Sequence, residues 1–144
     1  MASDVGERAE GAVAPDRPVV LVVEDEPPLL RAIGRLLRKH FEVLPARDAA
    51  EAREVAGVRH LDLILTDYEM PGESGVEGLR QLRALGHAAP ALIVTATPCA
   101  EVTAAIREGL ATAMVEKPWA VDELLDTALR LIGRPGLGAP GRVG

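Results

Sequence analysis

Residues 19–26 read VVLVVEDE, five apolar residues followed at once by three carboxylates. An apolar run of this length, without alternation, is typical of a strand that is buried on both faces of a sheet. The residues after it show helical spacing, with apolar side chains at positions 29, 30, 33, 36 and 37. A buried strand that leads into an amphipathic helix is the repeating unit of α/β proteins, so this stretch favours that fold class.

The alternation of apolar runs and helical patterns continues to residue 132. Four further runs are predicted to be strands: residues 41–44, 61–65, 91–94 and 113–115. Five strands that alternate with five helices predict a parallel sheet with helices on both faces. In such sheets a ligand binds beyond the carboxyl ends of the strands, so the functional residues are expected there.

Capping residues indicate where some of the helices begin. Ser74 and Glu77 occupy the two positions of a capping box in front of an apolar helical stripe. Thr97 and Pro98 are interpreted as the N-cap and the first residue of the helix after the fourth strand. Since that helix has few large apolar residues, we expect it to be marginal or exposed.

The chain of 144 residues has the length of one ordinary domain. Residues 1–17 lack apolar periodicity and are predicted to be a disordered lead. Seven of the twelve residues 133–144 are glycine or proline, which predicts a flexible tail or linker. The folded unit is therefore expected at residues 18–132.

The composition argues against several classes of protein. The net charge of -6, without a basic cluster, argues against a nucleic-acid binder, and an aromatic content of 2% is too low for a base-stacking surface. One cysteine provides no disulfide framework within the chain. No apolar run approaches the roughly 20 residues of a membrane span, and residues 1–17 hold no apolar signal-peptide core. A cytoplasmic location is therefore expected.

Charged and hydroxyl side chains stand where the predicted strands end. Glu24 and Asp25 follow the first strand, and Asp67 follows the third. Thr95 ends the fourth strand, and Lys117 comes just after the fifth. Parallel strands end at one edge of their sheet, so we expect these five side chains to converge there.

This set of residue types suits phosphoryl chemistry. Clustered carboxylates repel one another, and a hard divalent cation such as Mg²⁺ removes that repulsion. A carboxylate beside the cation can act as a nucleophile toward a phosphoryl group and form an acyl phosphate. A lysine and a hydroxyl would stabilise the negative charge on the transferred group.

Four segments carry a resemblance to a known family: VVLVVEDE at 19–26, LILTDYEMPGESG at 63–75, IVTAT at 93–97 and VEKPW at 115–119. Together they resemble the receiver domains of two-component response regulators, the CheY-like family, over residues 19–132. The resemblance implies a flavodoxin-like, doubly wound five-stranded parallel sheet in the order 2-1-3-4-5, with helices on both faces.

The resemblance also implies roles for individual residues. Asp67 would accept a phosphoryl group from a sensor histidine kinase or a His-containing phosphotransfer protein. Lys117 would pair with Asp67 and then with the phosphoryl group, and Thr95 would move inward to bind a phosphoryl oxygen. The peptide bond before Pro118 is expected to be cis. Such a protein is a phosphoacceptor that assists its own phosphorylation and dephosphorylation rather than a classical enzyme.

Mg²⁺ is the cofactor that the resemblance implies. Asp25 would bind it directly, Glu24 mostly through water, and Asp67 together with the backbone carbonyl of Glu69 would complete the protein ligands. Side chains at the positions of Glu69 and Thr97 gate the hydrolytic water in the family, so phosphoryl lifetime is expected to depend on them.

Met114 departs from the family pattern, which usually places Tyr or Phe three residues before the lysine. Thr95 and Met114 are the expected switch residues. They would act on the face formed by the helix that holds Val102 and Ile106 and by residues 113–115 and 121–132. A methionine can repack and still report phosphorylation, or the usual aromatic switch is absent. The alternative function is therefore a phosphorylation-independent pseudo-receiver that acts as an interaction module.

Two other classes fit the residues less well. An aspartyl phosphatase needs a second acid two residues after its nucleophile, and Glu69 is a poor substitute. A flavin-binding flavodoxin needs a phosphate-binding loop where Glu24 and Asp25 stand, and these would repel the phosphate. The expected partners are a kinase or phosphotransfer protein and an unknown downstream protein, with neither nucleic acid nor membrane, and the expected state is a monomer or weak dimer.

Overall fold

The structure, a computed structural model, describes residues 17–134. Its strands and helices alternate along the chain in this order: β2 (Val19–Val23), α2 (Pro27–Leu37), β3 (Glu42–Ala46), α3 (Ala49–Ala56), β4 (Leu63–Asp67), α4 (Gly75–Ala84), β5 (Ala91–Thr95), α5 (Ala100–Arg107), β6 (Ala113–Glu116) and α6 (Val121–Leu131). Apart from residues 17, 133 and 134, the predicted lead and tail lie outside the described residues.

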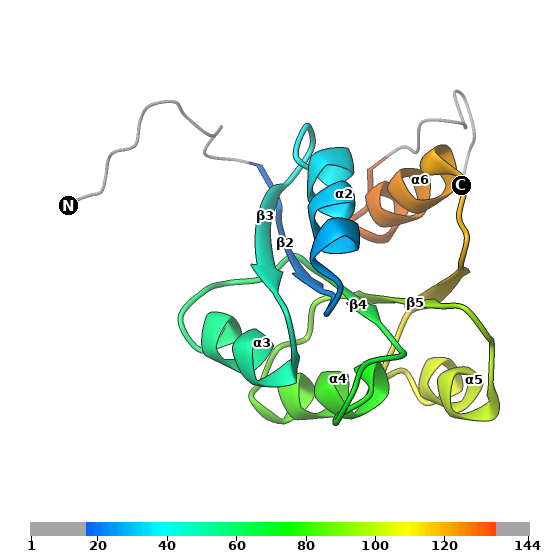
Figure 1. Ribbon diagram of the computed structural model, residues 1–144. Helices are drawn as coiled ribbons and strands as arrows, with labels where there is room; N and C mark the ends of the chain where they lie inside the picture. The colour runs from blue at the N-terminus through cyan, green and yellow to red at the C-terminus, as the bar shows by residue number, and fades with distance from the viewer. Residues whose placement is uncertain (1–16, 135–144) are drawn as a thin grey trace.

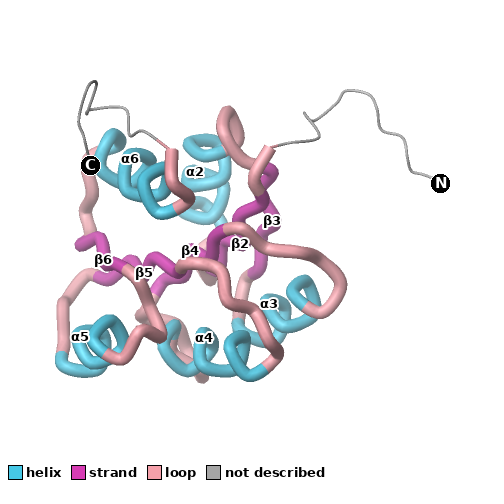
Figure 2. The backbone as a smooth tube through the Cα atoms, turned by 180° about the vertical axis from the view of Figure 1, so that it is seen from behind, coloured by secondary structure: helices cyan, strands magenta, loops and turns pink. Residues whose placement is uncertain are grey.

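The strands form a five-stranded parallel sheet in the order β3-β2-β4-β5-β6. Counted along the described chain, this is the order 2-1-3-4-5, so the predicted fold is confirmed. Helices α2 and α6 cover one face of the sheet, and α3, α4 and α5 cover the other (Figures 1 and 2). The chain order reverses beside β2, which leaves a crevice at the carboxyl ends of β2 and β4.

Each face of the sheet has its own hydrophobic core, because successive strand residues point to opposite sides. In β2, Leu21 and Val23 pack with the α3, α4 and α5 side, while Val20 and Val22 pack with α2 and α6. All four side chains are buried. This double burial explains why the run at 19–23 is continuously apolar. Among the described residues, no helix has the length and apolar character needed to cross a bilayer.

The start of α5 differs from the sequence prediction. The helix begins at Ala100 with Cys99 as its N-cap residue, so the assignment of Thr97 and Pro98 as N-cap and first helical residue was wrong. The backbone N–H of Thr97 is directed at Glu69 and at the Thr95 hydroxyl instead, and this keeps the chain in a loop for two more residues.

Four of the eight residues of this helix are exposed, in line with the prediction. Val102 and Ala105 are fully enclosed in the core on that face of the sheet. The capping box of Ser74 and Glu77 is confirmed, with both of its reciprocal hydrogen bonds present at the start of α4.

Candidate functional site

The residues predicted to converge do meet at the carboxyl edge of the sheet. The backbone places them: Tyr68 N–H donates to the Val94 carbonyl, and Lys117 N–H donates to the Thr95 carbonyl, each at 2.8 Å. These bonds continue the parallel ladder just past the ends of the paired strands. The residues that follow β2, β4, β5 and β6 are therefore held side by side at the carboxyl edge of the sheet.

Three carboxylates form the centre of this site. Glu24, Asp25 and Asp67 each offer an oxygen atom, and these atoms all lie within 4.8 Å of one another. The side chains of Glu24 and Asp67 are almost fully buried, with 1% and 2% of their surfaces exposed. Burial, reinforced by the neighbouring acids, raises the pKa of Glu24 to about 7 and also raises the pKa of Asp67.

Lys117 lies against Asp67, as the sequence predicted. Its Nζ atom is 2.7 Å from Asp67 Oδ1 and 4.0 Å from Glu69 Oε1. Burial lowers the pKa of Lys117, but the contact with Asp67 outweighs it and raises that pKa overall. Lys117 is thus the charged partner of this buried oxygen, and no other hydrogen-bond donor reaches it among the described residues.

The donor set fits a hard divalent cation. All three clustered side chains are carboxylates, and Mg²⁺ prefers a few carboxylate oxygens together with water and phosphate oxygens. Two of these carboxylates are buried with raised pKa values, and the single ammonium of Lys117 does not balance the charge of three carboxylates. A bound cation would balance it. A role for the Glu69 backbone carbonyl stays a prediction.

The Glu69 side chain has contacts that the sequence did not predict. Its carboxylate accepts hydrogen bonds from the Thr95 hydroxyl at 2.6 Å and from the Ala96 N–H at 3.1 Å, with the Thr97 N–H at 3.4 Å. Burial raises the pKa of Glu69, but these hydrogen bonds and the nearby Lys117 ammonium outweigh it and lower that pKa overall. Thr95 therefore lies at the site, with its hydroxyl engaged by Glu69.

Met114 lies within β6, and Pro118 follows the end of that strand. The Lys117–Pro118 peptide bond is cis. Met114 pairs with Ile93 in the sheet, upstream of the strand ends, and is partly buried against the core on the α5 side. The structure thus places Met114 in the body of the domain, apart from the acidic cluster.

Gly75 was also missed by the sequence analysis. A Cβ atom at this position would lie 2.2 Å from the carbonyl oxygen of Asp67, and the Gly75 N–H donates to the Tyr68 carbonyl at 3.0 Å. Only a residue without a side chain lets α4 start this close to the end of β4. A glycine directly after a capping serine, where helix formers are favoured, was the available signal.

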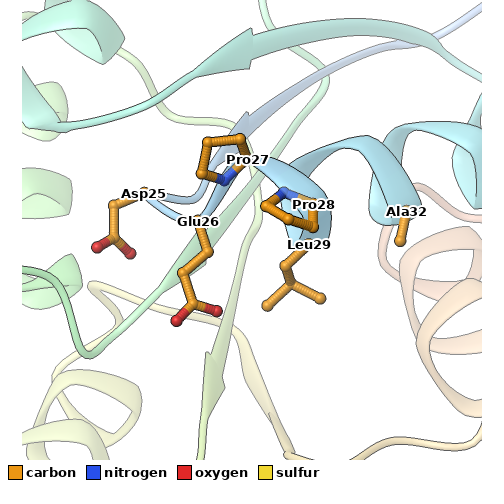
Figure 3. A pocket seen from close by; sticks show the side chains of 6 residues that line it. All are labelled: Asp25, Glu26, Pro27, Pro28, Leu29 and Ala32. Atoms are coloured by element: carbon orange, nitrogen blue, oxygen red, sulfur yellow. The ribbon is translucent and has the colours of Figure 1, made fainter.

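Asp25, one of the three clustered acids, lies at the surface beside the start of α2. A surface pocket there is lined by the segment Asp25–Leu29 and by Ala32. Figure 3 shows the Asp25 and Glu26 carboxylates at the junction of β2 and α2, next to the rings of Pro27 and Pro28. Of the three clustered acids, only Asp25 lines this pocket.

Known proteins match this chain in sequence over most of its length. The response regulator receiver domain profile matches residues 20–129. The hydrogenase transcriptional regulatory protein HoxA of Cupriavidus necator is 33% identical over 119 residues, which are 82% of this chain and 25% of HoxA. The transcriptional regulatory protein PrrA of Mycobacterium tuberculosis is 34% identical over 120 residues, 83% of this chain and 52% of PrrA. The chain thus spans about a quarter of HoxA and about half of PrrA.

Solved structures agree with the sequence matches. The chemotaxis protein CheY4 of Vibrio cholerae shares 27% identity with a TM-score of 0.74, over 79% of this chain and 98% of CheY4. The response regulator TrrA of Thermotoga maritima, determined in complex with Mg(2+)-BeF, shares 28% identity with a TM-score of 0.68, over 79% of this chain and 98% of TrrA. Profile, relatives and fold agree, and the chain belongs to the response regulator receiver domain family.

Proposed function

We propose that this receiver domain accepts a phosphoryl group on Asp67 in a Mg²⁺-dependent reaction. The donor is the phosphohistidine of a sensor histidine kinase or of a phosphotransfer protein. The observation that carries the proposal is the setting of Asp67: a buried carboxylate, 2.7 Å from the Lys117 ammonium and clustered with Glu24 and Asp25.

In the proposed reaction a carboxylate oxygen of Asp67 attacks the phosphorus of the donor. A P–O bond forms, the P–N bond to the imidazole breaks, and its electron pair stays on the imidazole nitrogen. Lys117 stabilises the negative charge on the phosphoryl oxygens, and this is its main contribution because the chemistry depends on positioning and charge. Hydrolysis of the acyl phosphate later restores the Asp67 carboxylate.

Glu24, Asp25 and Asp67 would hold the Mg²⁺ ion through their carboxylates. When bound, the cation would neutralise charge on these acids and on the phosphoryl oxygens. The TrrA structure, in complex with Mg(2+)-BeF, supports a cation and a phosphoryl-like group together in a related domain. The chain's own contribution is to bring the three acids together from the ends of β2 and β4.

The output is expected to pass through Thr95 and Met114 to the face formed by α5, β6 and α6. HoxA and PrrA are named as transcriptional regulatory proteins, and this chain matches only part of each. We propose that the phosphorylated domain acts on a downstream protein or domain, which the chain's residues do not identify. The second candidate function is the pseudo-receiver. The feature that favours it is Met114, which stands where the family usually has Tyr or Phe.

Mass spectrometry after incubation with Mg²⁺ and a small phosphodonor, such as phosphoramidate, tests the proposal. The wild-type protein should gain one phosphoryl group, and Asp67→Asn should gain none. This substitution preserves size at a buried position, and circular dichroism checks that the variant is folded. Labelling of the variant at this site would contradict the assignment, and an unlabelled wild type would favour the pseudo-receiver.

A further inference from the structure

The Glu69 carboxylate lies across the mouth of the proposed phosphoryl site. It projects from the residue two positions after Asp67. It reaches the last residue of β5 and the first residues of the loop after it, 26 to 28 residues further along the chain. Its side chain is 40% exposed, so solvent could supply its hydrogen bonds. The carboxylate nevertheless binds donors of this protein loop.

The hydrogen bonds of Thr95 show how strongly this carboxylate is engaged. A hydroxyl has one proton to donate. Thr95 Oγ1 lies 2.6 Å from Glu69 Oε2 and 3.1 Å from the Thr97 carbonyl oxygen, so the shorter and charge-assisted bond to Glu69 is favoured. The Ala96 N–H also points at both Glu69 oxygens, at 3.2 and 3.1 Å. Thr95 and Ala96 thus both direct their donors at the Glu69 carboxylate.

These donors are the ones that an anion on Asp67 would need. Asp67 pairs with Val94 in the sheet, so Thr95 and Ala96 follow directly beside the end of β4. Lys117 Nζ lies 2.7 Å from Asp67 and 4.0 Å from Glu69, between the two carboxylates. A phosphoryl group on Asp67 would therefore meet the Glu69 carboxylate, which already accepts hydrogen bonds from the Thr95 hydroxyl and the Ala96 N–H.

We propose that the Glu69 side chain is an internal competitor of the phosphoryl group. In the unphosphorylated protein it holds the Thr95 hydroxyl and the Ala96 N–H, and it has to release them before they can bind a phosphoryl oxygen. This inference rests on the proposed function. It adds that Glu69 regulates how readily Asp67 accepts a phosphoryl group. It differs from control of the hydrolytic water, which acts after transfer.

A merely structural role for Glu69 predicts the opposite result. If Glu69 only orders the loop, its removal frees the donors to move, and an anion has to order them again. Anion binding then weakens. If Glu69 competes, its removal leaves the donors available, and anion binding becomes tighter.

The experiment is a titration with beryllofluoride in saturating Mg²⁺, followed by the amide resonances of the full chain in ¹H–¹⁵N spectra. We expect the half-saturating concentration to fall about tenfold in Glu69→Ala, equivalent to about 1.4 kcal/mol. Glu69→Gln should show a fall of about threefold, because a neutral amide oxygen still accepts hydrogen bonds but more weakly. Before beryllofluoride is added, the Ala96 amide resonance should already shift in Glu69→Ala.

Glu116→Gln is the matched control for charge. Glu116 is exposed and precedes Lys117 in the chain, so this change removes one negative charge close to the site without touching the loop. It should change the half-saturating concentration by less than about twofold, since exposed charges are well screened. The Mg²⁺ affinity of Glu69→Ala should match that of the wild type, because the three clustered acids are intact.

Unchanged or weaker beryllofluoride binding by Glu69→Ala would overturn the competitor role. An equal gain in Glu69→Ala, Glu69→Gln and Glu116→Gln would also overturn it, because net charge alone would explain the result. Binding by the variant but not by the wild type would support it. Binding by neither protein would overturn the proposed phosphoacceptor function as well, which distinguishes the two failures.

Discussion

At the scale of single residues, the acidic cluster is a source of instability as well as of function. Glu24 and Asp67 are buried close to Asp25, and the electrostatic repulsion contributes to the raised pKa of both buried acids. The fold tolerates this arrangement because the strands on either side are anchored in two hydrophobic cores. In the proposed function these acids bind Mg²⁺, and the surrounding structure supplies the stability.

Asp25→Asn should therefore stabilise the metal-free protein. Removal of one like charge is expected to raise the free energy of unfolding by about 1 kcal/mol, the scale of one partly screened charge pair. The variant should lose most of the stabilisation by Mg²⁺, which in the wild type amounts to about 2.7 kcal/mol at a hundred times the dissociation constant. Urea denaturation with and without Mg²⁺ measures both quantities.

Glu54→Gln provides the control for this experiment. Glu54 is an exposed acid of α3, remote from the cluster in the chain, and its neutralisation should leave the Mg²⁺ effect intact. A metal-free Asp25→Asn protein that is less stable than the wild type would contradict the repulsion argument. Full stabilisation of that variant by Mg²⁺ would remove Asp25 from the metal site.

At the scale of the elements, the start of α4 sets the position of the phosphoacceptor strand. Gly75→Ala would place a methyl group 2.2 Å from the Asp67 carbonyl oxygen, so either the helix or the strand end has to move. We expect the free energy of unfolding to fall by about 2–3 kcal/mol, as for other overpacked sites. Beryllofluoride binding should weaken as well, because Asp67 moves with its backbone.

Gly78→Ala is the matched substitution in the same helix. Its Cβ would meet only Ala49 Cβ, at the ordinary contact distance of 3.4 Å, and neither glycine has a positive φ angle. Its effect on stability should stay within about 1 kcal/mol, the range of glycine-to-alanine differences in helices. Similar urea midpoints for the two variants would refute a special role for Gly75.

At the scale of the whole molecule, β6 connects the acidic site at its carboxyl end with the face formed by α5, β6 and α6. Met114 packs in the core on the α5 side, whereas Val115 faces the core of α2 and α6. Lys117 follows at the end of the same strand and contacts Asp67. A change at the strand end can therefore reach the face formed by α5, β6 and α6 through one short element.

Met114→Tyr should change the readout and leave the chemistry in place. Mg²⁺ affinity should equal that of the wild type, because Met114 contributes nothing to the acidic cluster. The affinity for the downstream partner should change, because the side chain packs beneath the output face. The measurement is binding of the isolated partner with and without beryllofluoride, and an unaltered affinity would exclude Met114 from the switch.

Much of the fold and site could be predicted from local patterns. Continuous apolar runs indicate strands buried on both faces, and parallel strands end at a common edge, so Glu24, Asp67 and Lys117 had to converge. The capping box at Ser74 and Glu77 was equally accessible, because it depends on residues three apart. Such features are local and periodic, or follow from the geometry of parallel sheets.

The sequence by itself thus determined the fold class, the sheet order implied by the family motifs, and the acids that meet at the strand ends. Only the tertiary structure decided that Glu69 folds across to Thr95, that α5 starts at Ala100, and that Gly75 lies against Asp67. The physical reason is that these features depend on contacts between separate segments. A carboxylate two residues after a strand can face solvent or a neighbouring loop, and only the packed loop supplies the donors that choose between them.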